Sequence, residues 1–166
     1  MTSITNSMAA SKRHRGWAVF LFVCYLVLLL YFLFFSEGFG RIQAQHTGYQ
    51  YDRIPFRYNL TPFKEITRFI RYRHVVGFHA FFVNVFGNII AFMPMGFFLP
   101  AVTGKKLNGM QILVLSFLFS LSVETVQLLT KLGCFDVDDL ILNTLGGILG
   151  YLIYRVLHGL WMRKQN

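Results

Sequence analysis

The sequence is poor in charged residues. Asp, Glu, Lys and Arg make up 14% of its 166 residues, and only seven residues are acidic. Soluble domains carry about 25% charged residues, so this shortage excludes an ordinary soluble globule. The two cysteines, Cys24 and Cys134, provide neither a disulfide framework nor a zinc-site spacing. Four prolines and 14 glycines without a repeat exclude a collagen-like chain.

Apolar residues are abundant instead. They make up 55% of the chain, and 17% of the chain is aromatic, including 19 Phe and 8 Tyr. The formal net charge of +9 suits either nucleic acid or an anionic membrane surface. The hydropathy favours the membrane, and no nucleic-acid reader motif accompanies the basic residues. We therefore expect an integral membrane protein that binds no nucleic acid.

Four apolar stretches reach the roughly 20 residues that a helix needs to span the hydrocarbon core. They cover residues 17–35, 78–100, 109–130 and 140–160. The first follows a basic cluster at 12–15, but it is too long for a secretory signal and no small-residue cleavage site follows it. The sequence predicts an all-α, polytopic bundle of four transmembrane helices with an uncleaved N-terminal anchor.

The predicted topology places both termini in the cytoplasm. Lys and Arg are divided equally between the two sides, so the basic cluster before the first span decides the orientation. Residues 1–16 then form a basic cytoplasmic N-terminus, and residues 36–77 form an extracytoplasmic loop. The protein is expected in the cell membrane as a multi-pass protein.

A short amphipathic helix is predicted within this loop, near 62–73. Thr61 is a suitable N-cap and Pro62 suits the first helical position. Apolar side chains gather on one side of this helix and basic ones on the other, which is typical of a helix in the membrane interface. The alternative is an ordinary amphipathic segment that packs over the bundle. Possible contacts for anionic headgroups on its basic side are Lys64, Arg68 and Arg71.

Polar and small residues recur at helical spacing in the last three spans. The stripes are Asn84, Gly87, Asn88 and Ala91; Ser116, Ser120, Glu124 and Gln127; and Asn143, Gly146, Gly147 and Gly150. Lipid offers these side chains no hydrogen bonds, so the stripes are expected to face one another. Chain direction places the polar groups toward one membrane face. The candidate polar site comprises Asn84, Asn88, Glu124, Gln127, Asp136, Asp138, Asp139 and Asn143.

Two interpretations of this site stay open. A carboxyl such as Glu124 at a bilayer centre costs roughly 3 kcal/mol, so either a ligand-binding task or a hydrogen-bonded core network that fixes helix register explains it. Asp136 or Asp138 can cap the fourth helix, whereas the acidic loop as a whole can bind a hard cation. Its spacing is not that of an EF-hand loop, so no metal, cofactor or catalytic residue is assigned.

Four short motifs in order resemble the VanZ-like membrane proteins over residues 59–154. They are Asn59-Leu60-Thr61-Pro62-Phe63; Asn84-xxx-Asn88 with Phe92-Met93-Pro94-Met95-Gly96; Ser120-xxx-Glu124-xx-Gln127; and Phe135-Asp136-Val137-Asp138-Asp139-xxx-Asn143-Thr144-Leu145-Gly146-Gly147. By similarity the motif positions are Asn88, Pro94, Gly96, Glu124, Gln127, Asp136, Asp139, Asn143 and Gly147. Members often carry a basic residue just before the acidic loop, where this chain has Gly133-Cys134, with Lys131 two residues earlier.

The resemblance implies a function without an established reaction. The family's namesake is associated with low-level resistance to teicoplanin, a lipid-tailed glycopeptide, and not to vancomycin. We expect this protein to act at the outer face, through a groove lined by Phe63, Arg68, Glu124 and the 136–139 loop. Its expected partners are membrane lipid and a lipoglycopeptide antibiotic or lipid-linked cell-wall precursor. The alternative is a small membrane enzyme that acts on a lipid headgroup or lipid-linked cell-wall precursor. In it Glu124 is a general base or metal ligand, and Arg68 or Arg71 holds phosphate. A transport subunit is a weaker reading.

Overall fold

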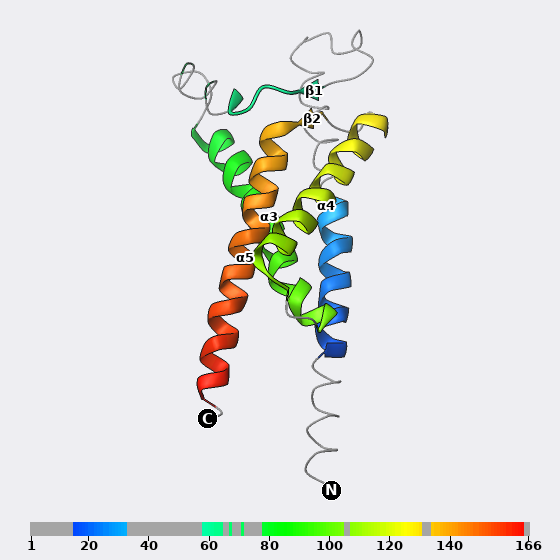
Figure 1. Cartoon of the computed structure of the whole chain (residues 1–166). Coiled ribbons are helices and arrows are strands. Elements are labelled where there is room, and N and C mark those ends of the chain that lie inside the picture. The colour runs from blue at the N-terminus through cyan, green and yellow to red at the C-terminus, as the bar shows by residue number, and fades with distance from the viewer. Residues whose placement is uncertain are drawn as a thin grey trace, which may run out of the picture.

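The computed structural model describes residues 15–32, 58–64, 67, 71, 78–104, 107–130 and 134–164. Four long helices lie in these ranges: an N-terminal helix Arg15–Phe32, α3 (Phe78–Thr103), α4 (Gly109–Thr130) and α5 (Val137–Arg163). Each contains a segment long and apolar enough to cross a membrane. The predicted all-α bundle with four membrane helices is therefore confirmed (Figure 1). Predictions for residues 1–14 and 33–57 lie outside the described ranges.

Local capping explains where the helices begin and end. Asp136 has extended backbone angles, and its side chain accepts a hydrogen bond from the Asp138 backbone N–H at 2.9 Å. It is therefore the N-cap that starts α5 at Val137, three residues before the predicted span. α4 begins with a reciprocal capping box, in which the side chains of Asn108 and Gln111 each accept from the other's backbone N–H. Gly104, with φ 63°, ends α3 in the left-handed conformation common after helices.

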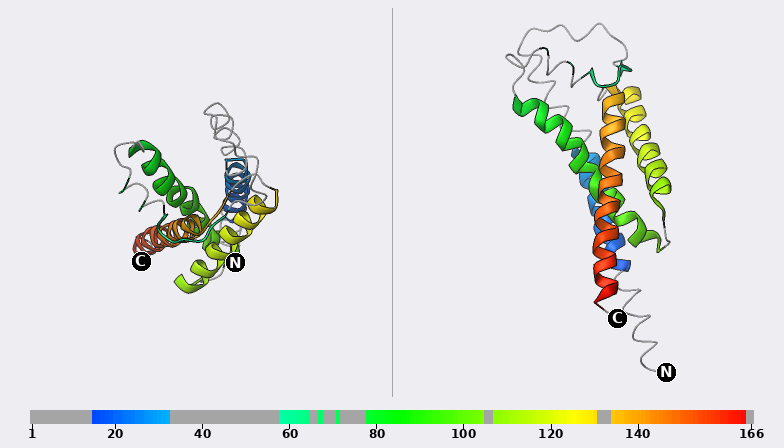
Figure 2. Two further views of the ribbon diagram at one scale, coloured as in Figure 1. Left: turned by 90° about the horizontal axis from the view of Figure 1, so that it is seen from above. Right: turned by 60° about the vertical axis from the view of Figure 1, so that its left-hand side comes forward.

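α5 is the central helix of the bundle. It packs against both α3 and α4, and α3 crosses it obliquely (Figure 2). The crossing needs glycine, because a Cβ on Gly150 would lie 2.7 Å from the Met93 carbonyl carbon and closer still to its oxygen. A Cβ on Gly96 would meet the Gly147 carbonyl in the same way. Small residues thus let the two backbones touch, as the glycine spacing in the fourth span predicts.

The N-terminal helix lies at the edge of the bundle and packs on α3. Leu29 is buried with Phe92 and Met95 of α3. The Tyr25 hydroxyl donates to the Ala91 carbonyl at 2.8 Å, within the turn of α3 that precedes Pro94. Arg15 Nε donates to the Val102 carbonyl at 2.9 Å, near the C-terminus of α3. A cation there is favourable because the helix dipole makes that end negative.

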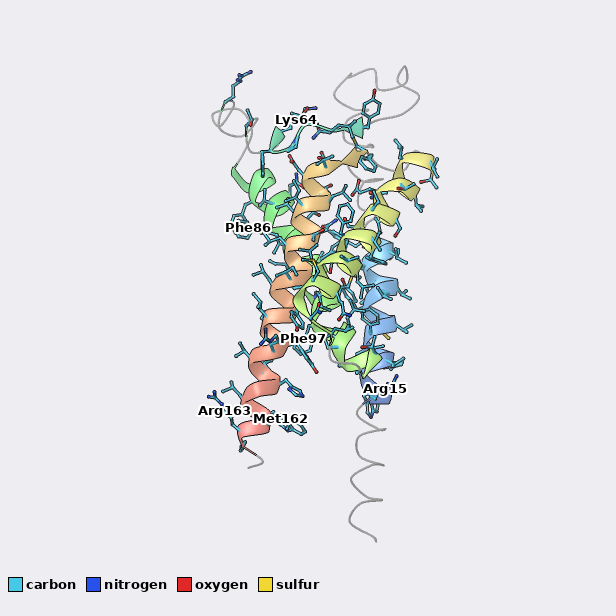
Figure 3. The ribbon with its side chains drawn as sticks, viewed as in Figure 1. Arg15, Lys64, Phe86, Phe97, Met162 and Arg163 are labelled. Carbon is cyan, nitrogen blue, oxygen red and sulfur yellow. The ribbon has the colours of Figure 1, made fainter. Side chains whose placement is uncertain are left out.

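The two ends of the bundle differ. Arg15 and Arg163 lie at one end, whereas Lys64 lies at the other (Figure 3). At the Lys64 end, the two-residue strands β1 (Tyr58–Asn59) and β2 (Phe135–Asp136) pair in parallel, with Asn59 opposite Asp136. The predicted cytoplasmic location of the Arg15 and Arg163 end stays a prediction.

The predicted interfacial helix lies mostly outside the described residues, including Ile66, Arg68, Phe69 and Ile70. Phe63 adopts φ 60°, which is not helical, and its carbonyl accepts from the Thr67 backbone N–H at 2.9 Å. The first helical turn therefore follows Phe63. This differs from the prediction of Thr61 as N-cap, because the left-handed backbone of Phe63 cannot belong to a right-handed helix that begins at Pro62.

Candidate functional site

A hydrogen-bonded cluster joins α4, α5 and the β1 segment at the Lys64 end of the bundle. Its innermost carboxylate is Glu124, which is only 3% exposed. Glu124 Oε2 accepts a hydrogen bond from the Asp136 backbone N–H at 3.0 Å. The intramembrane carboxyl that the sequence singles out therefore faces the start of α5 and not lipid.

Asp136 is the centre of the cluster. Its Oδ1 accepts from the Asp138 backbone N–H and, at 3.0 Å, from Asn59 Nδ2. Asn59 is buried, and its own Oδ1 accepts from the Thr61 backbone N–H at 3.3 Å. Sequence reasoning did not include Asn59 in the candidate site. Its place at the head of the first family-like motif is the signal that identifies it.

The next two carboxylates bind different elements. Asp138 is buried and accepts from the Phe63 backbone N–H, which fixes the residue at the turn. Asp139 accepts from Asn88 Nδ2, which joins α5 to α3. The same Asn88 amide lies 3.5 Å from Asn84 Oδ1, one turn away on α3. The structure thus brings together Asn84, Asn88, Glu124, Asp136, Asp138 and Asp139.

A second polar layer lies deeper between α4 and α5. Asn143 Nδ2 donates to Ser120 Oγ at 3.0 Å, and both residues are fully buried. Asn143 Oδ1 and Ser116 Oγ are buried, and neither has a hydrogen-bond partner among the residues that the structure describes. Gln127 is buried on the same face of α4. The predicted stripe on α4 is therefore buried, and it contacts α5 at Ser116 and Ser120 and the N-cap of α5 at Glu124.

The carboxylates of this cluster act as hydrogen-bond acceptors that connect different elements of the bundle. Asp136, Asp138 and Asp139 turn to three separate partners, and no group of three or more His, Cys, Asp or Glu side chains within the described residues is placed to hold a metal ion. Glu124 and Asp138 lie beneath the surface, so they do not line an open groove beside Phe63. The geometry favours the core-network interpretation for these carboxylates. A general-base role for Glu124 stays a prediction.

The surface around the cluster is apolar and basic. Tyr58, Leu60 and Phe63 are 64%, 61% and 56% exposed, and Lys64 and Arg71 are exposed as well. Arg68 lies outside the described residues. Two of the three predicted basic residues are therefore on the surface, and Lys64 lies at the β1 end.

Comparison with known proteins identifies the family. The model of the VanZ/LLP1 family matches residues 22–158. The chain belongs to the VanZ/LLP1 family. Protein VanZ of Enterococcus faecium is 28% identical to this chain over 134 residues, which cover 81% of this chain and 71% of that protein. No solved structure matches the chain. The resemblance deduced from motifs at 59–154 is confirmed, and the family match extends it in both directions.

Most of the motif positions predicted from the VanZ-like resemblance lie on α5 or in contact with it. Asn88, Glu124, Asp136 and Asp139 belong to the cluster at its start. Gly147 and Gly96 form the close crossing of α5 with α3. Asn143 lies in the deeper layer, and Pro94 lies next to the contact with Tyr25. The motifs that suggest the VanZ/LLP1 family from sequence thus consist mainly of residues of α5 and of residues that pack against it.

Proposed function

We propose that this VanZ/LLP1 protein resides in the cell membrane and lowers susceptibility to acyl-tailed glycopeptides of the teicoplanin type. It acts at the β1 end of the bundle, which we assign to the outer face. The observation that carries the proposal is the exposed apolar surface of Tyr58, Leu60 and Phe63 beside Lys64. Membership of the family whose namesake is associated with teicoplanin resistance supports it.

This surface suits an amphiphilic molecule in the membrane interface. The 22 residues of α4 extend roughly 33 Å at 1.5 Å per residue, which matches a hydrocarbon core of about 30 Å. The β1 segment then lies near the boundary, where aromatic and basic side chains are favoured. An acyl-tailed antibiotic concentrates at the same depth, and so does the headgroup of a lipid-linked cell-wall precursor. In this proposal the exposed surface contacts the antibiotic or the precursor headgroup at the membrane boundary.

The polar cluster supports this surface from below. Asn59 is tied to Asp136 and Phe63 to Asp138, so both ends of the exposed segment are fixed to α5. A surface held before binding loses less conformational entropy when a ligand arrives. In this proposal the buried carboxylates position the surface, and the exposed side chains bind.

The test is susceptibility of a glycopeptide-sensitive Gram-positive strain that expresses the full chain. We expect a several-fold higher inhibitory concentration of teicoplanin and an unchanged one for the tailless vancomycin. Leu60→Ser should reduce the effect, whereas Leu160→Ser, at a similarly exposed leucine of the opposite end, should retain it. Equal changes for both drugs, or none for teicoplanin, would refute the proposal.

The orientation has its own test. In a chain whose Cys24 and Cys134 are replaced by serine, an impermeant thiol reagent should label Thr47→Cys and not Ser3→Cys in intact cells. Exclusive labelling at position 3 would place the β1 end in the cytoplasm and remove the proposed encounter at the outer leaflet.

A further inference from the structure

We propose that α3 and the β1 segment form a binding site for an anionic glycerophospholipid, called here the α3 lipid site. It consists of Lys64, Phe82, Asn84, Phe86, Gly87 and Ile90. The proposal goes beyond the function above, because it concerns a lipid that the protein binds whether or not an antibiotic is present.

Open space beside Gly87 is the first observation. Gly87 is half-buried in α3, yet no atom of the described residues lies within 4 Å of a Cβ placed there. The other glycines of this region, such as Gly96 and Gly146, have a backbone carbonyl where their Cβ would be. Glycine weakens a helix interior relative to alanine, and helix packing within the described residues does not explain its use here. The space is available to a ligand.

Polar groups line the same side of α3. Asn84 lies three residues before Gly87, and Asn88 lies one residue after it. The Asn88 side chain donates a hydrogen bond to Asp139 of α5. Asn84 is half-buried, and its Oδ1 accepts from Asn88. In the described part of the chain, Asn84 Nδ2 donates no hydrogen bond. It is a donor for a phosphate or hydroxyl oxygen that enters beside Gly87.

Lys64 supplies the positive charge. It follows Phe63, whose backbone N–H donates to Asp138 at the start of α5. The next residue of α5, Asp139, accepts a hydrogen bond from Asn88 of α3. These contacts place Lys64 over the junction of α3 with α5, and Figure 3 shows it above the start of α5. Neither Lys64 nor Arg71, the second exposed cation of this segment, forms an ion pair with another described residue. A lipid phosphate satisfies such a cation at the membrane boundary.

An apolar stripe lies on a neighbouring face of α3. At about 100° per residue, Gly87 lies between Asn84 on one side and Ile90 on the other. Phe82 and Phe86 stack with their ring centroids 4.2 Å apart, and both are exposed. Ile90 follows one turn later on the same face and is exposed too. An acyl chain whose phosphate lies near Lys64 and Asn84 would pass beside Gly87 to reach this stripe. Phosphatidylcholine neutralises its own phosphate with choline, so the geometry points to a lipid with net negative charge.

The experiment uses the full chain, purified in a neutral detergent, and follows its thermal midpoint during titration with phosphatidylglycerol, phosphatidylcholine or glycerol 3-phosphate. We expect phosphatidylglycerol to raise the midpoint more than phosphatidylcholine does, because a ligand that binds only the folded state stabilises it. Glycerol 3-phosphate should have no effect at matched concentration, since it lacks the acyl chain.

Matched variants assign the effect to the site. Lys64→Glu should weaken the apparent affinity for phosphatidylglycerol by about tenfold, and Lys164→Glu, an exposed lysine of the other end, should not. Gly87→Phe should abolish the response, and Gly159→Phe should keep it, because Gly159 also has no atom of the described residues within 4 Å of a Cβ. If Gly87→Phe does not accumulate, the two lysine variants decide.

Several outcomes would overturn the assignment. Equal midpoint shifts for the two lipids would remove the charge selectivity, and equal losses in the two lysine variants would show a general charge effect. A full response to glycerol 3-phosphate would show a free-phosphate site without an acyl component. None of these results bears on the resistance proposal, which is judged by susceptibility alone.

Discussion

Replacing Gly150 with alanine is expected to force α3 and α5 apart. The new Cβ would lie 2.7 Å from the Met93 carbonyl carbon, whereas ordinary van der Waals contact begins at 3.4 Å. The backbones must therefore separate by at least 0.7 Å (3.4 − 2.7), and by more to clear the oxygen. Because carbonyl groups of a helix cannot rotate away as side chains do, the neighbouring contact of Gly146 with Ile89 loosens too.

The cost is measurable against a control. Overpacking of this kind destabilises by about 1–3 kcal/mol. Alanine also favours the helix over glycine by about 0.5–1 kcal/mol, and Gly159→Ala on the same helix has that gain without a clash. The difference in unfolding free energy between the two variants thus isolates the steric cost.

We would measure it by unfolding in mixed micelles with increasing dodecyl sulfate, followed by circular dichroism. Gly150→Ala should unfold at lower denaturant than Gly159→Ala by an amount equivalent to about 1–3 kcal/mol. Equal stability of the two variants would show that α3 and α5 do not approach as closely as described.

Three further predictions use the same assay. Asp136→Ala should lower stability by about 1–2 kcal/mol because it removes the N-cap of α5, and Asp136→Asn should restore most of it; no difference between them would argue against the cap. Ser116→Ala should leave the free energy of unfolding unchanged or raise it. Ser120→Ala should lower it by about 1–3 kcal/mol, because Asn143 loses its hydrogen-bond partner. The reverse order of stability would contradict the described pairing. Tyr25→Phe should cost about 1 kcal/mol through loss of the bond to the Ala91 carbonyl, and an unchanged midpoint would mean that water replaces the hydroxyl.

Local features of the sequence were sufficient for the architecture. Hydropathy and length predict the spans, because a membrane helix must satisfy its backbone internally and be apolar over the core thickness. The cap of α5 and the face formed by Ser116, Ser120, Glu124 and Gln127 also follow from short-range pattern. The family resemblance is readable for the same reason, since its motifs are short runs of neighbouring residues.

The tertiary structure alone decided which polar and small residues meet. Gly87 and Gly96 look alike in sequence. Gly96 touches Gly147 where α3 crosses α5, whereas Gly87 lies away from the crossing and has no contact of this kind with another described residue. Asn59 reaches Asp136 across 77 positions, and that pairing turns the predicted acidic loop into a network of satisfied carboxylates. Periodicity fixes the face of a helix on which a residue lies, whereas the partner on that face depends on how distant segments pack, which no local pattern specifies.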